Sequence, residues 1–181
     1  MSIEDRSKVS QTSITISNGL SKNLQGNILT LSGPLGKCIK NFSKVPVTIT
    51  LNDDVLTIKS YRSRKFDIAI VNTVQSHVKN MIRGVTKGFT YRLKVVYAHF
   101  PMTVKIKDDK VYIENFYGER SARIANILGD CKVIVEGDDV VVKGVSIEDV
   151  GQTAANIEQI TRIKRKDQRV FLDGVYFYDR K

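Results

Sequence analysis

The fold is decided by Val47–Ile58, which reads VTITLNDDVLTI, and by a similar stretch at Lys132–Lys143, which reads KVIVEGDDVVVK. Each consists of two apolar-rich runs joined by a short acidic turn, Asn52–Asp54 in the first and Gly137–Asp139 in the second. Alternation of apolar and polar residues predicts half-buried strands, and Asn, Asp and Gly favour tight turns. The chain is therefore predicted to contain the same β-hairpin twice.

A helix is predicted after each hairpin. The first, Asp67–Lys87, has Gly84 and Gly88 as stop signals. Its apolar stripe at three- and four-residue spacing is Val71, Val74, Val78, Ile82 and Val85. The second, near Ile147–Ile163, opens with a capping-box pattern at Ser146 and Asp149. Its stripe is Val150, Ala154, Ile157 and Thr161.

The elements before the hairpins recur as well. Ile28–Phe42 alternates apolar and polar residues, and Lys110–Asn115 leads into a turn at Phe116–Gly118. The turns Gly33–Lys37 and Asn115–Glu119 align when the two hairpins are superposed. Because one helix can cover one face of a sheet, the repeat predicts an α+β fold of two tandem duplicated modules, each an antiparallel-rich β-sheet packed on one helix.

The predicted division of the chain has three parts. Residues 1–11 form a polar leader, residues 12–88 the first module, and residues 89–181 the second module with a C-terminal basic and aromatic segment. Within this division, Phe89–Pro101 is predicted to be a strand that leads from the first helix into the second module.

The charge of the chain indicates a polyanionic partner. Lys and Arg outnumber Asp and Glu by 29 to 19, which gives a net charge of +10. Residues 28–107 contain 14 basic and three acidic residues, so the excess is clustered, not scattered as ordinary solvation would have it. A second dense basic run consists of Arg162, Lys164, Arg165, Lys166 and Arg169. Both clusters are candidate phosphate-contacting surfaces.

Several classes of site are not expected. The chain lacks the glycine-rich phosphate-binding motifs, and His77 and His99 lie in different elements without a nucleophile motif, so no catalytic residue is predicted. The acidic pairs Asp53-Asp54 and Asp138-Asp139 fit turn chemistry better than a metal site. We therefore expect neither an enzyme nor a cofactor nor a bound metal.

The remaining short patterns favour a reduced, non-membrane protein. Cys38 and Cys131 have no CxxC spacing and are interpreted as reduced, part-buried packing residues. No apolar run approaches the roughly 20 residues of a membrane-spanning helix, and a cytosolic protein is expected. Gly33–Gly36 has the GxxG form of an RNA-clamping loop, but it lies between strand-like segments where that loop joins helices.

Aromatic and basic residues are interleaved in two places, Tyr91–Tyr97 and Arg162–Tyr178. Arg and Lys bind phosphates, and aromatic rings stack on bases. For Phe171, Tyr176 and Phe177, burial in the core is the competing interpretation, and the sequence leaves it open.

Longer stretches resemble a known family. The run VQSHVKNMIRGVTKGF at residues 74–89, continued by VYAHFP at 96–101, is similar to the sixth universal protein of the large ribosomal subunit, the ninth in eukaryotic naming. DQR at 167–169 and FLDGVY at 171–176 resemble the C-terminal motif of its eukaryotic and archaeal branch. The likeness extends from about Ile14 to Tyr178.

The resemblance implies a structural constituent of the cytoplasmic ribosome with two duplicated α+β domains. It implies binding to large-subunit rRNA near the factor-binding region and the sarcin-ricin loop, with neighbouring ribosomal proteins as partners and translation factors close by. The alternative is an RNA-binding or assembly protein of another ribonucleoprotein built on the same module.

The resemblance also implies particular RNA-binding residues. The family's C-terminal RNA-facing motif falls on Lys164, Lys166, Arg169, Asp173 and Gly174, and its inter-domain linker on Lys87, Gly88, Arg92 and Lys94. Arg162 and Arg165 join the first group because they belong to the same basic run. Gly174 is expected to permit close backbone approach.

Overall fold

The computed structural model describes residues 10–16, 19–62, 64–164, 166–167 and 169–181. The chain divides into two compact units, residues 1–87 and residues 88–181. Both combine antiparallel sheets with one helix, which confirms the predicted α+β class.

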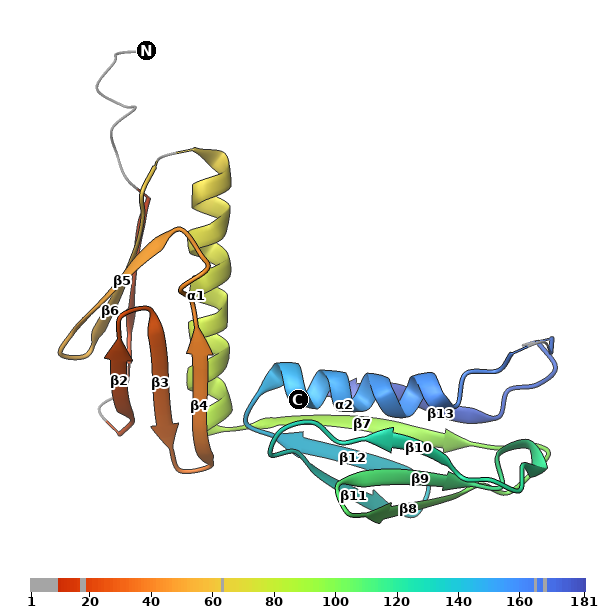
Figure 1. The fold of residues 1–181 in the computed structure, drawn as a ribbon. Coiled ribbons are helices and arrows are strands. Elements are labelled where there is room, and N and C mark those ends of the chain that lie inside the picture. The colour runs from red at the N-terminus through yellow and green to blue at the C-terminus, as the bar shows by residue number, and fades with distance from the viewer. Residues whose placement is uncertain (1–9, 17–18, 63, 165, 168) are drawn as a thin grey trace. The chain divides into compact units, whose positions relative to one another are not determined.

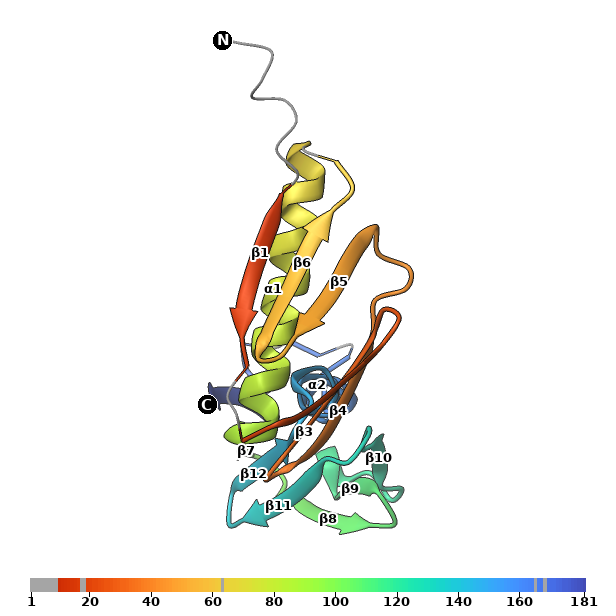
Figure 2. The same cartoon turned by 90° about the vertical axis from the view of Figure 1, so that its left-hand side faces the viewer.

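The first unit, within the described residues, has two three-stranded sheets and one α-helix (Figures 1 and 2). One sheet has the order β1-β6-β5 and the other the order β2-β3-β4. Helix α1 contacts strands of both sheets. The elements are β1 (Gln11–Thr15), β2 (Ser21–Gln25), β3 (Ile28–Gly33), β4 (Gly36–Asn41), β5 (Val47–Asn52), β6 (Val55–Ser60) and α1 (Lys65–Thr86).

The predicted hairpin of the first unit is formed by β5 and β6. Asn52 pairs with Val55 at its end, and Asp53 in the turn adopts a left-handed φ of 47°. Along β5, buried Val47 and Ile49 alternate with exposed threonines, as half-buried strands require. The alternation predicted from the sequence is therefore confirmed.

Helix α1 buries most of its predicted stripe. Val71, Val74, Val78 and Val85 are buried, but Met81 is buried where Ile82 was expected, because the buried face is shifted by one residue near the C-terminal end. The predicted stop at Gly84 is wrong, since α1 continues to Thr86. The chain leaves the helix at Gly88, whose φ of 73° favours glycine.

The second unit repeats this arrangement and adds a strand. Its sheets have the orders β11-β12-β7-β13 and β10-β9-β8, and α2 contacts strands of both. The elements are β7 (Phe89–Val96), β8 (Thr103–Lys107), β9 (Lys110–Glu114), the 3-10 turn η2 (Phe116–Gly118), β10 (Arg123–Asn126), β11 (Lys132–Glu136), β12 (Asp139–Gly144), α2 (Ile147–Ile160) and β13 (Gly174–Arg180).

The duplication is visible in the strand order. β5-β6-β1 in the first unit corresponds to β11-β12-β7 in the second, and β2-β3-β4 corresponds to β8-β9-β10. Each unit thus has two small sheets where the sequence predicted one. The sequence did not predict strands β1, β2, β8, β10 and β13. The first four have four or five residues each and carry little periodicity, and β13 falls in the segment that was predicted only as basic and aromatic.

The predicted connecting strand is an integral part of the second unit. β7 lies between β12 and β13, and its Leu93 and Val95 are buried. Helix α2 packs Val150, Ala154 and Ile157 into the same core. It ends at Ile160, three residues before the predicted end, so that buried Thr161 caps the helix and does not belong to it.

Candidate nucleic-acid interface

The basic segment begins directly after α2, and alternate residues of it are anchored. Thr161 and Ile163 are buried, whereas Arg162 and Lys164 are exposed. The Thr161 hydroxyl donates to the Glu158 carbonyl at 2.9 Å and accepts from the Val175 amide at 3.0 Å, which ties the end of α2 to β13. Two cations are therefore presented on the outer side of a segment whose inner side is fixed.

Lys166 continues this basic surface over an aromatic cluster. Its ammonium lies 4.7 Å from the ring centroid of Phe171 and 5.6 Å from that of Tyr117. Phe171 in turn packs against His99, with ring centroids 5.0 Å apart. A cation above aromatic faces loses part of its conformational freedom but keeps its charge, so Lys166 is held in place and remains exposed.

Arg169 is also exposed, with 90% of its side chain accessible to solvent. Its guanidinium binds both carboxylate oxygens of Asp167, at 3.2 and 3.1 Å. These hydrogen bonds lower the pKa of Asp167. An ion pair this exposed contributes little to stability, so a phosphate can compete for the guanidinium. Arg165 of the predicted set lies outside the described residues.

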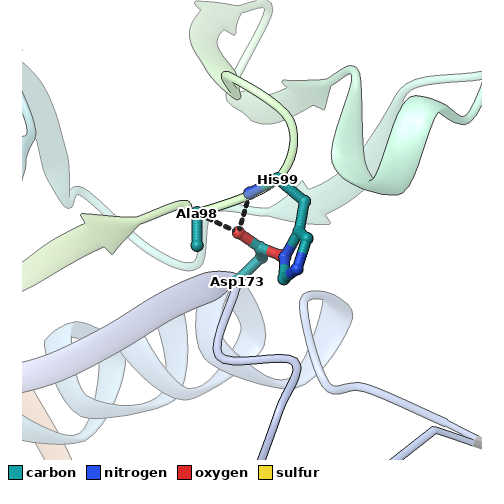
Figure 3. A network of polar contacts seen from close by, with 3 residues as sticks. All are labelled: Ala98, His99 and Asp173. Atoms are coloured by element: carbon teal, nitrogen blue, oxygen red, sulfur yellow. Dashed lines mark hydrogen bonds and ion pairs between the residues drawn. The ribbon is translucent and has the colours of Figure 1, made fainter.

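Asp173 is buried and fastens the end of this loop to the segment after β7 (Figure 3). Its Oδ1 accepts hydrogen bonds from the amides of Ala98 and His99, and its Oδ2 lies 2.9 Å from Nδ1 of His99. Burial by itself raises the pKa of Asp173, but these hydrogen bonds outweigh burial and hold the pKa below its ordinary value. Since the carboxylate is occupied inside the protein, Asp173 positions the loop.

Gly174 is also buried, and the side chain of Tyr176 lies close to it. A Cβ at this position would lie 3.1 Å from three atoms of the Tyr176 side chain. The ring therefore packs over the glycine at the start of β13, which is one of the two edge strands of the four-stranded sheet. The aromatic residues near it are neither fully buried nor fully exposed: Tyr176 and Phe177 are each 40% exposed, and Phe171 is half-buried.

Of the four residues assigned to a linker, two lie between α1 and β7 and two lie within β7. Lys87 caps the C-terminus of α1, and Gly88 follows it. Arg92 and Lys94 lie within β7, in the four-stranded sheet and inside the connecting strand predicted at Phe89–Pro101. Lys94 is opposite Tyr176 in the strand register and forms an ion pair with Asp139 at 3.3 Å.

Sequence reasoning missed the role of Arg123 on β10. Its guanidinium donates to both oxygens of Glu119 and to the carbonyl of Ile160 at the end of α2, and it lies 4.1 Å from the Phe116 ring centroid. The hydrogen bond from Arg123 lowers the pKa of Glu119. No local pattern marks this residue, because its contact with Ile160 spans 37 positions.

The other candidate residues take part in contacts or turns within the protein. His77 lies 2.9 Å from the Lys40 ammonium through Nδ1 and packs against Phe42. Gly33–Gly36 is the tight turn between β3 and β4. Within the described ranges, no group of three or more His, Cys, Asp or Glu residues could hold a metal ion, and no helix is long and apolar enough to cross a membrane.

Comparison with known proteins gives consistent matches. The family model described as ribosomal protein L6 matches residues 100–174. The "Large ribosomal subunit protein uL6" of Methanobrevibacter smithii is 45% identical over 90% of this chain and 92% of its own length. Proteins of the same name from Aeropyrum pernix and Methanosphaera stadtmanae are 42% and 51% identical, over 92% and 78% of each chain.

Proposed function

The chain belongs to the uL6 family of large ribosomal subunit proteins, and we propose that it binds and stabilises large-subunit rRNA through the basic segment that follows α2. Membership gives it a structural role in the ribosome. We further propose that the partner is large-subunit rRNA, that the basic segment is the binding surface, and that the protein lies near the factor-binding region and the sarcin-ricin loop. In this proposal the protein is cytoplasmic, contacts neighbouring ribosomal proteins and has translation factors nearby.

One observation carries the proposal. Arg162, Lys164, Lys166 and Arg169 are all exposed on a segment that is anchored at both ends, by Thr161 and by Asp173. Cations kept on one side of the protein by these two anchors suit the phosphates of folded RNA, because less conformational freedom is lost on binding. Lys87, Gly88, Arg92, Lys94 and Arg165 remain proposed contacts, and Gly174 is proposed to act through the Tyr176 ring.

The test measures how rRNA affinity depends on salt. Replacing Arg162, Lys164, Lys166 and Arg169 together by glutamine is expected to lower affinity and to reduce the slope of log affinity against log salt by about 3, or roughly 0.7 to 0.9 per contact. The matched control removes four exposed lysines elsewhere in the second unit: Lys105, Lys107, Lys110 and Lys132.

Both variants lose four positive charges, so a difference between their salt slopes shows that the position of those charges decides RNA binding. Equal slopes for the two variants would contradict the assignment of the basic segment. Co-sedimentation distinguishes the alternative ribonucleoprotein: a ribosomal constituent stays with assembled large subunits at high salt. The proposal includes no catalysis, and reproducible turnover by the purified protein would contradict that part.

A further inference from the structure

A groove of about 670 Å³ opens beside the basic segment of the second unit. Its apolar lining includes Val96, Ile163 and Leu172, and the Tyr176 ring and the side chains of Glu158 and Arg162 also border it. This volume falls within the range of roughly 300 to 1,000 Å³ that small-ligand pockets occupy. The groove lies at one edge of the sheet, where β13 meets the end of α2.

The Tyr176 ring is held in a fixed place. It packs over Gly174, where a Cβ would come within 3.1 Å of the ring, and 40% of the residue stays exposed. An aromatic ring supported on one side and open on another can stack a planar group. Stacking of this kind is how proteins commonly bind unpaired RNA bases.

Cations border the groove on one side. Arg162 lines both the groove and a neighbouring depression, which Arg123 and Lys164 also line. An apolar groove next to positive charge matches a nucleotide, which joins an aromatic base to an anionic phosphate. An apolar protein segment would also match the walls, but it would not match the exposed positive charges of Arg162 and Lys164.

We propose that this groove binds one unstacked base of the rRNA, stacked on Tyr176, with its flanking phosphates at Arg162 and Lys164. The inference rests on the proposed function and makes it more specific. The Glu158 carboxylate can accept hydrogen bonds from an amino group of the base.

The experiment uses the full chain and a transcript of large-subunit rRNA. Replacing Tyr176 by leucine is expected to weaken binding by roughly 5- to 150-fold, the loss of one base–aromatic stack, without changing the salt slope. Tyr176→Phe keeps the ring and is expected to bind like the wild type. Tyr178→Leu is the matched control, because Tyr178 lies on the same strand, is 50% exposed and does not line the groove.

Ultraviolet crosslinking followed by mass spectrometry provides the second readout. A base attached to the peptide of residues 170–180 is expected. If Tyr176→Leu and Tyr178→Leu bind equally well and this peptide carries no base, the base site is refuted while rRNA binding stands.

Two further outcomes distinguish failure of the proposed base site from failure of the proposed rRNA binding. If Tyr176→Leu impairs association with large subunits but not affinity for the transcript, the groove docks a protein and the inference is overturned. If the wild-type protein does not bind the transcript at all, the proposed function itself fails.

Discussion

Replacing Asp173 by alanine is expected to loosen the end of the basic loop. The amides of Ala98 and His99 lose their acceptor, and an orphaned buried donor costs about 1 to 3 kcal/mol. Ala98 and His99 lie at exposed positions, so water replaces part of the lost hydrogen bonding. The cost for each amide is therefore at the low end of this range, which gives about 2 kcal/mol for both amides together. The His99 side chain is 39% exposed, so its pairing with Asp173 adds little.

Amide hydrogen exchange measured by NMR reports this change locally, and the absence of tryptophan makes it preferable to intrinsic fluorescence. A loss of about 2 kcal/mol corresponds to roughly 30-fold faster exchange at Ala98 and His99. Asp173→Asn keeps an oxygen acceptor for the two amides, so its cost is expected to be about 1 kcal/mol.

The matched control is Asp167→Asn, which removes the same charge from an exposed position in the same loop. Electrostatics alone predicts tighter RNA binding for both variants, because each loses a negative charge. If Asp173 positions the loop, Asp173→Asn binds more weakly than Asp167→Asn. Equal RNA affinity of the two variants, together with unchanged exchange at Ala98 and His99, would refute the reasoning.

Three other outcomes are expected. Because the folded pKa of Asp173 is lowered, its contribution to stability is present above about pH 4 and is lost as pH falls through the folded pKa; acid unfolding should therefore show a smaller pH dependence in Asp173→Asn than in the wild type. Gly33→Ala should destabilise by about 1 to 3 kcal/mol in urea unfolding, since its Cβ would lie 2.7 Å from the Val85 carbonyl oxygen. Gly19→Ala, with open space around it, should change stability by less than about 0.5 kcal/mol, and equal effects would contradict the packing argument. Burial raises the pKa of the Cys131 thiol, so iodoacetamide should modify it more slowly in the folded protein than in urea, as peptide mapping would show.

Local sequence patterns predicted the elements whose residues face a core along their own length. The hairpins at Val47–Ile58 and Lys132–Lys143 and the stripes of both helices are examples, because a period of two or 3.6 is set by burial of one face. Repetition of these patterns was enough to predict a duplicated α+β fold. The short strands β1, β2, β8 and β10 were missed because four or five residues contain too few periods to stand out. Strand β13 was missed because Val175–Tyr178 are four consecutive apolar and aromatic residues without alternation.

The sequence also predicted where the described cations of the C-terminal run would be exposed, but it could not predict what holds them. Asp173 was chosen as an RNA contact, and in the structure its carboxylate binds Ala98 and His99. Gly174 was expected to permit close backbone approach, and in the structure the group that lies close to it is the Tyr176 side chain.

The sequence by itself determined the two hairpins, the two helices, the repeat and the surplus of positive charge, because each depends on residues that are neighbours along the chain. Only the tertiary structure decided that β13 returns to pair with β7 and that Asp173 reaches residues about 75 positions earlier. It also decided that Tyr176 borders a groove with Arg162. Contacts between distant positions depend on where the chain returns, and no local period records that return.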